Sequence, residues 1–133
     1  MIDQTHRKRQ PRADFVEAID LVPTFVEMMG GKVATHRVEG RSLMPLLQDG
    51  GVVEEWRDAV FSEIDYSMRH ARNTVGLPPH AARAYMVRTE DWKYALFEGF
   101  CPQLFDLRGD PNELKDVGTD PDHTAIRAEL HER

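Results

Sequence analysis

The amino-acid sequence predicts an α+β fold: a small antiparallel sheet of three to four strands, with a packed C-terminal helix and an N-terminal helix. The first observation is the alternation of side chains along residues 84–97, which is typical of a β-hairpin. The second is a loop rich in aspartate, glycine, proline and asparagine, since such residues separate strands from helices. The third is a helical spacing of apolar residues near each end. We expect strands at about residues 59–64, 84–89, 92–97 and 103–107, and helices at residues 19–29 and 121–132.

Composition limits the class of protein. The chain has 133 residues, 41% of them hydrophobic and 30% charged, which suits one globular domain. A formal net charge of −6 argues against general binding to nucleic acid. No apolar run approaches the roughly 18 residues that cross a bilayer, so we expect no membrane contact. Cys101 is the single cysteine, which excludes an intramolecular disulfide and a cysteine-based zinc site. We therefore expect a cytoplasmic protein, because no apolar segment follows the basic N-terminal residues.

The chain divides into a flexible basic arm, residues 1–13, and a single domain, residues 14–133. Like charges repel one another in the arm, at Arg7, Lys8, Arg9 and Arg12. A contact with nucleic acid or an acidic partner is the alternative for the arm, but the rest of the chain offers no second basic patch.

The predicted helix at residues 19–29 has clear boundaries. Asp20 can cap its first turn, Pro23 falls where a missing N–H matters little, and Gly30 and Gly31 end it. Its apolar residues form two adjacent stripes rather than the single stripe of an ordinary surface helix. The stripes are Ile19, Val22, Val26 and Met29, and Leu21, Phe25 and Met28. We expect part of this helix to face a partner surface.

Residues 31–57 look mostly irregular. They contain one short helical turn from Ser42 to Gln48, ended by Gly50 and Gly51, and Trp56 is expected to anchor the following strand. After strand 59–64, Gly76 and the Pro78-Pro79 pair predict a long loop over residues 67–83.

The strongest strand signal is the hairpin at residues 84–97, with Glu90 and Asp91 at its turn. Its aromatic residues suggest base stacking or core packing, and we favour core packing for Trp92, Tyr94 and Phe97. In the terminal helix we expect Asp120 as the cap, Pro121 at the first position, and Ile126 and Leu130 facing the core.

Candidate catalytic residues lack the patterns that catalysis requires. The acidic cluster does not have calcium-loop spacing, so a turn that caps backbone groups is the better interpretation for Asp106, Asp110, Glu113 and Asp116. His123 and His131 lie eight residues apart on the predicted helix, and we expect both to be solvated. Ser42 and Ser62 lack a nucleophile elbow, and Cys101 has no flanking histidine and reads as an inert loop thiol.

Three patches resemble one known family. They are EAIDLVPTFVEMMGG with EGRSLMPLL, then AVFSEIDYS, then MVRTEDWKY with EGFCPQLFDL and RGDPNELKDVG. Together they resemble the C-terminal region of the sulfatases and phosphonate monoester hydrolases, within the alkaline-phosphatase-like superfamily. The resemblance implies the C-terminal subdomain fold and, for the full family, hydrolysis of sulfuric or phosphonic and phosphoric esters with a divalent metal and often a formylglycine.

The family's catalytic residues have no counterparts here. Its nucleophile lies in a C-x-P-x-R or S-x-P-x-R context, whereas Cys101 is followed by Pro102, Gln103 and Leu104. We therefore assign no catalytic, cofactor-binding or metal residue, and we expect no activity and no bound cofactor in this chain by itself.

The resemblance leaves the biological role open. The expected partner is a missing catalytic domain. The alternatives are a stand-alone homo-oligomeric interaction module and a fragment from a mis-called gene start. In a complete enzyme, Tyr66, Arg69 and Arg72 would lie near the substrate entrance, where arginine suits anionic oxygens; a solvated loop is the alternative.

Overall fold

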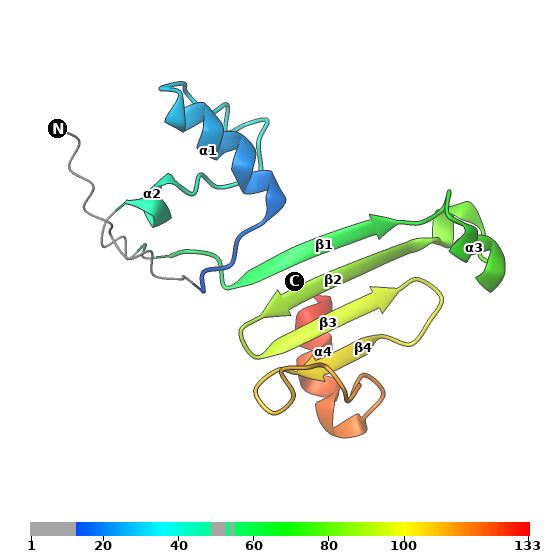
Figure 1. Cartoon of the computed structure of the whole chain (residues 1–133). Coiled ribbons are helices and arrows are strands. Elements are labelled where there is room, and N and C mark those ends of the chain that lie inside the picture. The colour runs from blue at the N-terminus through cyan, green and yellow to red at the C-terminus, as the bar shows by residue number, and fades with distance from the viewer. Residues whose placement is uncertain (1–12, 49–52, 54) are drawn as a thin grey trace.

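A four-stranded antiparallel sheet in the order β1-β2-β3-β4 organises the fold (Figure 1). The computed structural model describes residues 13–48, 53 and 55–133. The strands are β1 (Ala59–Asp65), β2 (Arg83–Thr89), β3 (Trp92–Phe97) and β4 (Gln103–Asp106). The predicted α+β class and all four strands are therefore confirmed, and their ends differ from the prediction by at most one residue.

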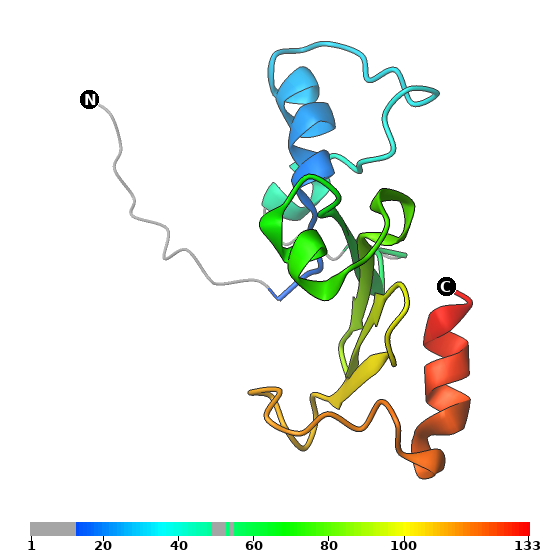
Figure 2. The same ribbon diagram turned by 90° about the vertical axis from the view of Figure 1, so that its right-hand side faces the viewer.

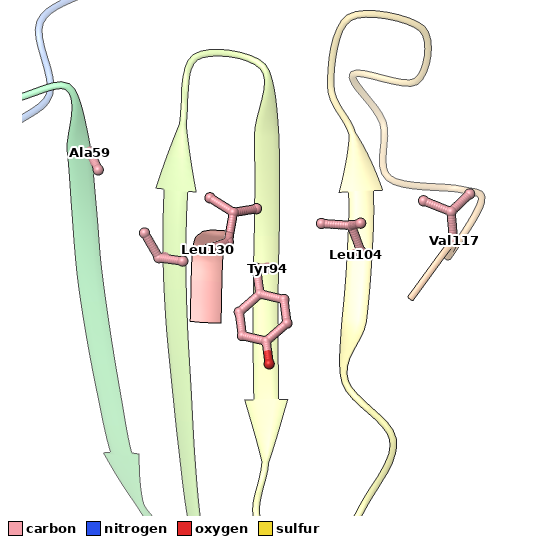
Figure 3. Packing of buried hydrophobic residues seen from close by; sticks show 6 residues of the cluster. Ala59, Tyr94, Leu104, Val117 and Leu130 are labelled. Carbon is pink, nitrogen blue, oxygen red and sulfur yellow. The ribbon is translucent and has the colours of Figure 1, made fainter. Parts of the chain in front are cut away.

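One face of the sheet carries the core. Because side chains alternate along a strand and the strands pair in register, Phe61, Val87, Tyr94 and Leu104 share one face. The terminal helix α4 (Thr124–His131) follows a 3₁₀ turn over Pro121–His123 and lies across this face (Figure 2). The buried cluster consists of Ala59, Val87, Tyr94, Leu104, Val117 and Leu130 (Figure 3).

The expectations for the terminal helix are confirmed. Leu130 belongs to the buried cluster and Ile126 packs against it. The Asp120 side chain caps the helical segment by accepting a hydrogen bond from the Asp122 amide, and Pro121 occupies the first turn. The helix thus covers the apolar face with the two residues that its spacing predicts.

The prediction that the hairpin aromatics pack in the core is confirmed for two of the three. Tyr94 is in the core and Trp92 packs against it. The prediction is wrong for Phe97, which is 37% exposed. Phe97 follows Tyr94 by three positions, an odd number, so its side chain points to the other face of the sheet. That face carries no α4.

The N-terminal part of the described chain forms a lobe over residues 13–48. A 3₁₀ turn over Ala18–Asp20 leads into α1 (Leu21–Met28), and α2 (Met44–Leu47) follows, near the predicted turn from Ser42 to Gln48. Figure 1 places this lobe beyond the first residue of β1, away from α4. Pro23, Thr24 and Leu46 are its buried residues besides Asp20.

The prediction that Asp20 caps α1 is wrong. Asp20 stands at the N-cap position, but its side chain accepts no hydrogen bond from the first turn of α1. Its two carboxylate oxygens are instead occupied by the Glu17 and Arg41 amides and the Arg57 guanidinium. A charged partner from a distant segment outcompetes the local amides.

The predicted loop at residues 67–83 contains helical structure. Here α3 (His70–Val75) and a 3₁₀ turn over Pro79–Ala81 were not predicted. Gly76 adopts a left-handed conformation, with φ of 72°, and ends α3. Gly76, one of the residues that suggested a loop, therefore marks the end of a short helix. The predicted arm, apart from Ala13, and the stop at Gly50 and Gly51 lie outside the described residues.

Candidate functional site

An exposed apolar surface lies on α1 and on the residues that flank it. Six side chains there are between 46% and 79% exposed; we call them the α1 surface: Ile19, Leu21, Val22, Phe25, Met28 and Met29. At 100° per residue, the five from position 21 onward fall within an arc of roughly 120°. Beside this arc, the Thr24 hydroxyl accepts a hydrogen bond from the Leu43 amide. The chain therefore covers α1 on one side and leaves an apolar arc open, as a partner surface requires.

Most side chains of the two predicted apolar stripes are thus exposed on the surface. Of the seven residues, only Val26 is half-buried; the other six are exposed. The predicted need for cover on more than one side agrees with this arrangement, since the described chain covers only the side that carries Pro23 and Thr24.

A buried ion cluster lies at the base of the lobe. The Arg57 guanidinium donates to the Asp20 carboxylate at 2.6 Å and also to Glu17. The Glu17 carboxylate accepts a further hydrogen bond, at 2.7 Å, from the Phe61 amide in β1. Asp20 is fully buried, and the exposed fraction of the Arg57 side chain is 9%. Burial of this kind requires every charge to be paired, as it is here.

Trp56 is tied to the same cluster. Its indole N–H donates to the Phe15 carbonyl at 2.7 Å, and the Arg57 guanidinium lies 5.7 Å from its ring. The indole of Trp56 thus holds the segment before α1, and its predicted role as an anchor of the following strand stays a prediction.

An apolar groove of about 690 Å³ lies at the other end of the sheet, between α3 and the β3–β4 connection. Its lining is mostly hydrophobic and includes Tyr66, Val75, Phe97, Phe100 and Cys101. Phe97 reaches this groove because it points to the face that α4 does not cover.

The three predicted entrance residues follow one another in space, because the Arg69 amide donates to the Tyr66 carbonyl and the Arg72 amide donates to the Arg69 carbonyl, but only one of them lines the groove. Tyr66 lines the groove, but Arg69 and Arg72 do not. Arg69 is the residue before α3, and Arg72 donates at 3.2 Å to the Leu77 carbonyl, closing the end of that helix. One of the three thus has a local structural role that sequence spacing did not reveal.

The acidic cluster forms a turn, as predicted. Asp116 accepts hydrogen bonds from the Leu104 and Gly118 amides at 3.0 and 2.8 Å, and Asp110 accepts one from the Lys115 amide at 2.7 Å. The Arg108 side chain hydrogen-bonds Asp106 and lowers the pKa of its carboxyl. Glu113 differs, because it forms an ion pair with Lys93. Two of these carboxylates thus accept hydrogen bonds from backbone amides, and the other two form ion pairs at the surface.

The two histidines of the terminal segment contact aromatic rings. His123 is half-buried, with its ring 5.6 Å from that of Trp92, so the prediction that it is solvated is wrong. His131 is exposed as predicted, yet its Nδ1 atom lies 3.1 Å from the Tyr94 hydroxyl. Burial raises the pKa of that hydroxyl.

The described residues do not fit a metal centre. Within residues 13–48, 53 and 55–133, no three histidine, cysteine, aspartate or glutamate side chains converge on one point. Cys101 is exposed on the groove. In the same part of the chain, no helix has the length and apolarity that a membrane span demands.

Solved structures that this chain resembles include two phosphonate monoester hydrolases. The phosphonate monoester hydrolase of Agrobacterium radiobacter is 37% identical with a TM-score of 0.78, over 90% of this chain and 24% of that one. The enzyme of Silicibacter pomeroyi is 32% identical with a TM-score of 0.78, over 88% of this chain and 24% of that one.

Sequence relatives point the same way. The multifunctional alkaline phosphatase superfamily protein of Trinickia caryophylli is 31% identical over 92% of this chain and 24% of its own length. Arylsulfatase K of Gallus gallus is 33% identical over 84% of this chain and 20% of its own length. The chain thus spans about a fifth to a quarter of the relatives it matches.

Fold and sequence together define the class as the C-terminal region of alkaline-phosphatase-like sulfatases and phosphonate monoester hydrolases. Residues 2–133 match the sequence profile described as "N-sulphoglucosamine sulphohydrolase, C-terminal", and the chain belongs to that family.

Proposed function

We propose that this chain is the C-terminal domain of a hydrolase of sulfuric, phosphonic or phosphoric esters and is inactive by itself. Its α1 surface packs against the part of the enzyme that carries the nucleophile and metal. The observation that carries the proposal is the open apolar arc on α1, which ordinary soluble surfaces avoid at this extent. The chain's share of its relatives, about a quarter, agrees with a domain that needs a larger partner.

The chemistry of the residues supports the inactivity of the isolated chain. Ester cleavage of this kind requires an activated nucleophile and strong charge stabilisation on the transferring group. Cys101 lacks the family's nucleophile context, and the described residues offer no convergent ligand set. A divalent metal and a formylglycine would therefore belong to the catalytic part, and no step is assigned to residues of this chain.

The activity test uses the purified chain with aryl sulfate, phosphonate and phosphodiester substrates, with added manganese or zinc. We expect turnover no greater than in buffer. Turnover clearly above buffer that a chelator abolishes would overturn the inactive-domain proposal.

The docking test compares the chain with a triple variant, Val22→Ser, Phe25→Ser and Met28→Ser. We expect the unchanged chain to bind an apolar-surface dye and the variant to bind much less, with the sheet still folded. Leu114→Ser is the matched control, since Leu114 is 85% exposed but lies far from α1 in the sequence. Equal dye binding by the chain and the triple variant would contradict the proposed role of the α1 surface.

A second candidate is a stand-alone module that covers the same surface by homo-oligomerisation. Light scattering separates the two: a dimer that the triple variant dissociates favours the module, whereas a dye-binding monomer favours a missing catalytic part. A monomer with no dye-binding surface would contradict both.

Tyr66, Arg69 and Arg72 remain proposed contacts at the substrate entrance of the assembled enzyme. Arg69 is exposed, so its charge is available to an anionic substrate. Once a catalytic part that binds this chain is in hand, we expect Arg69→Ala to raise KM with little change in kcat. An unchanged KM in Arg69→Ala and Tyr66→Phe would remove these residues from the entrance.

We also propose a cytoplasmic location, since Cys101 is the single cysteine and disulfides are absent by necessity. Fractionation of the source cells should place the chain with cytoplasmic markers. Recovery in a secreted or envelope fraction would contradict it.

A further inference from the structure

The lobe and the sheet do not share an apolar core. Every member of the buried cluster under the sheet comes from residues 59–130, and none comes from the lobe, residues 13–48. The lobe has buried residues of its own, including Pro23, Thr24 and Leu46. A cleft of about 720 Å³ runs between the start of the lobe, the β2–β3 turn and the last residues of α4. Within the described residues, the buried apolar cluster therefore does not extend from the sheet into the lobe.

Polar contacts connect the two parts, and the strongest of them reach the lobe from residues 56, 57 and 61; the Arg41 guanidinium adds a longer one, at 3.4 Å, to the Glu55 carbonyl. Arg57 binds Glu17 and Asp20, the Trp56 indole binds the Phe15 carbonyl, and the Phe61 amide binds Glu17. These hydrogen bonds span 37 to 44 positions in the sequence, so each one restrains the lobe as a whole.

On the lobe side, backbone amides hold the Asp20 carboxylate. Asp20 accepts hydrogen bonds from the Glu17 and Arg41 amides, each at 2.8 Å, in addition to Arg57. Gly40 allows this close approach, because a Cβ atom there would lie 2.1 Å from the Ile19 carbonyl oxygen. Asp20 thus fastens residue 41 to the start of α1 and presents one oxygen to Arg57.

We infer that Arg57 is a positioning residue: its guanidinium is a charged joint that fixes the orientation of the α1 lobe on an independently packed sheet domain. A guanidinium suits this task, because its planar fork reaches two carboxylates at once. A charged joint specifies one orientation more strictly than apolar packing does, since any other orientation leaves the buried Asp20 carboxylate and the half-buried Glu17 carboxylate without a counter-charge. This inference concerns the chain itself and does not depend on the proposed function.

The test is hydrogen exchange measured by mass spectrometry on the full chain and on Arg57→Met, which keeps the length of the stem and removes the charge. We expect amides of α1 and the Phe61 amide to exchange at least about tenfold faster, while β2, β3 and α4 keep their protection. Arg108→Met is the matched control: Arg108 also pairs with an aspartate and lies 5.2 Å from a tryptophan ring, but its side chain is 57% exposed. It should leave the lobe unchanged.

A neutral variant tests whether the charged joint itself is needed. Adding Glu17→Gln and Asp20→Asn to Arg57→Met removes the unpaired negative charges and keeps oxygens that can accept from the backbone amides. We expect the lobe's protection to stay low, because no charged pair then specifies its orientation. Faster exchange throughout the chain, unchanged exchange in the lobe after Arg57→Met, the same pattern in Arg108→Met, or full protection of the lobe in the neutral variant would each overturn the inference.

Discussion

The Tyr94 hydroxyl lies 3.1 Å from Nδ1 of His131, so a buried ring in the middle of the sheet is joined to the last turn of α4. The rings of the two residues meet edge to face, with their centroids 6.1 Å apart. The phenol body packs among Val87, Leu104 and Leu130, while its polar end reaches the helix. Tyr94 therefore attaches α4 to the sheet in two ways: its ring packs against Leu130 in the core, and its hydroxyl meets His131.

The first prediction concerns alkaline pH. Burial raises the pKa of Tyr94 in the folded chain above its unfolded value of about 10. The stability that this shift contributes is fully present below about pH 10 and is lost as the pH rises through the folded pKa. In Tyr94→Phe this part of the loss is absent, so urea denaturation should show a smaller fall in stability between about pH 9 and pH 11. Tyr66→Phe, at the apolar groove, is the control; a fall as steep in Tyr94→Phe as in the unchanged chain would contradict the prediction.

The second prediction concerns the centre of the core. Leu104 has no exposed surface, so Leu104→Ala should remove buried contacts and leave a cavity, at a cost of about 2–5 kcal/mol in the free energy of unfolding. Leu114→Ala, at an 85% exposed position, should change it by less than about 0.5 kcal/mol. Urea denaturation measures both, and equal effects would mean that Leu104 is not central to the core.

The third prediction concerns the passage of the chain beside β4. A Cβ atom on Gly118 would lie 2.1 Å from the Pro102 carbonyl oxygen, which is backbone and cannot turn aside. Gly118→Ala should therefore destabilise the fold by about 1–3 kcal/mol or more. Gly109→Ala is the matched control, because a Cβ atom there meets no atom within 4 Å. Thermal unfolding should separate the two, and similar melting temperatures would show that residues 102 and 118 lie further apart.

The fourth prediction concerns the turn that returns to β4. Because the Asp116 carboxylate receives two backbone amides, Asp116→Ala should leave them without a partner, at a cost of about 1–3 kcal/mol. Asp122→Ala, at an exposed position in the next turn, should change stability by less than about 0.5 kcal/mol. An Asp116 variant as stable as the control would show that water replaces the carboxylate.

Much of the candidate site could be anticipated, but not its geometry. Apolar residues on two sides of residues 19–29 indicated apolar side chains without cover, and six of those seven residues are exposed; that a partner covers them stays a prediction. The apolar groove was not predicted, because its walls come from α3 and the β3–β4 connection, which are far apart in sequence. Phe97 was the available signal for the groove: it lies three positions from Tyr94 in the same strand, so it faces away from the core.

Local sequence patterns determined the strands of the hairpin, the terminal helix and the residues with which that helix meets the core. These features depend on neighbouring side chains with periods of two or about 3.6 residues, so a short stretch contains the necessary information. Tertiary structure alone decided that Asp20 binds Arg57, 37 positions away, instead of capping α1, and that His131 meets Tyr94 across the same sequence distance. The physical reason is that a polar side chain binds the strongest partner that the fold brings within reach, and chain order does not encode that distance.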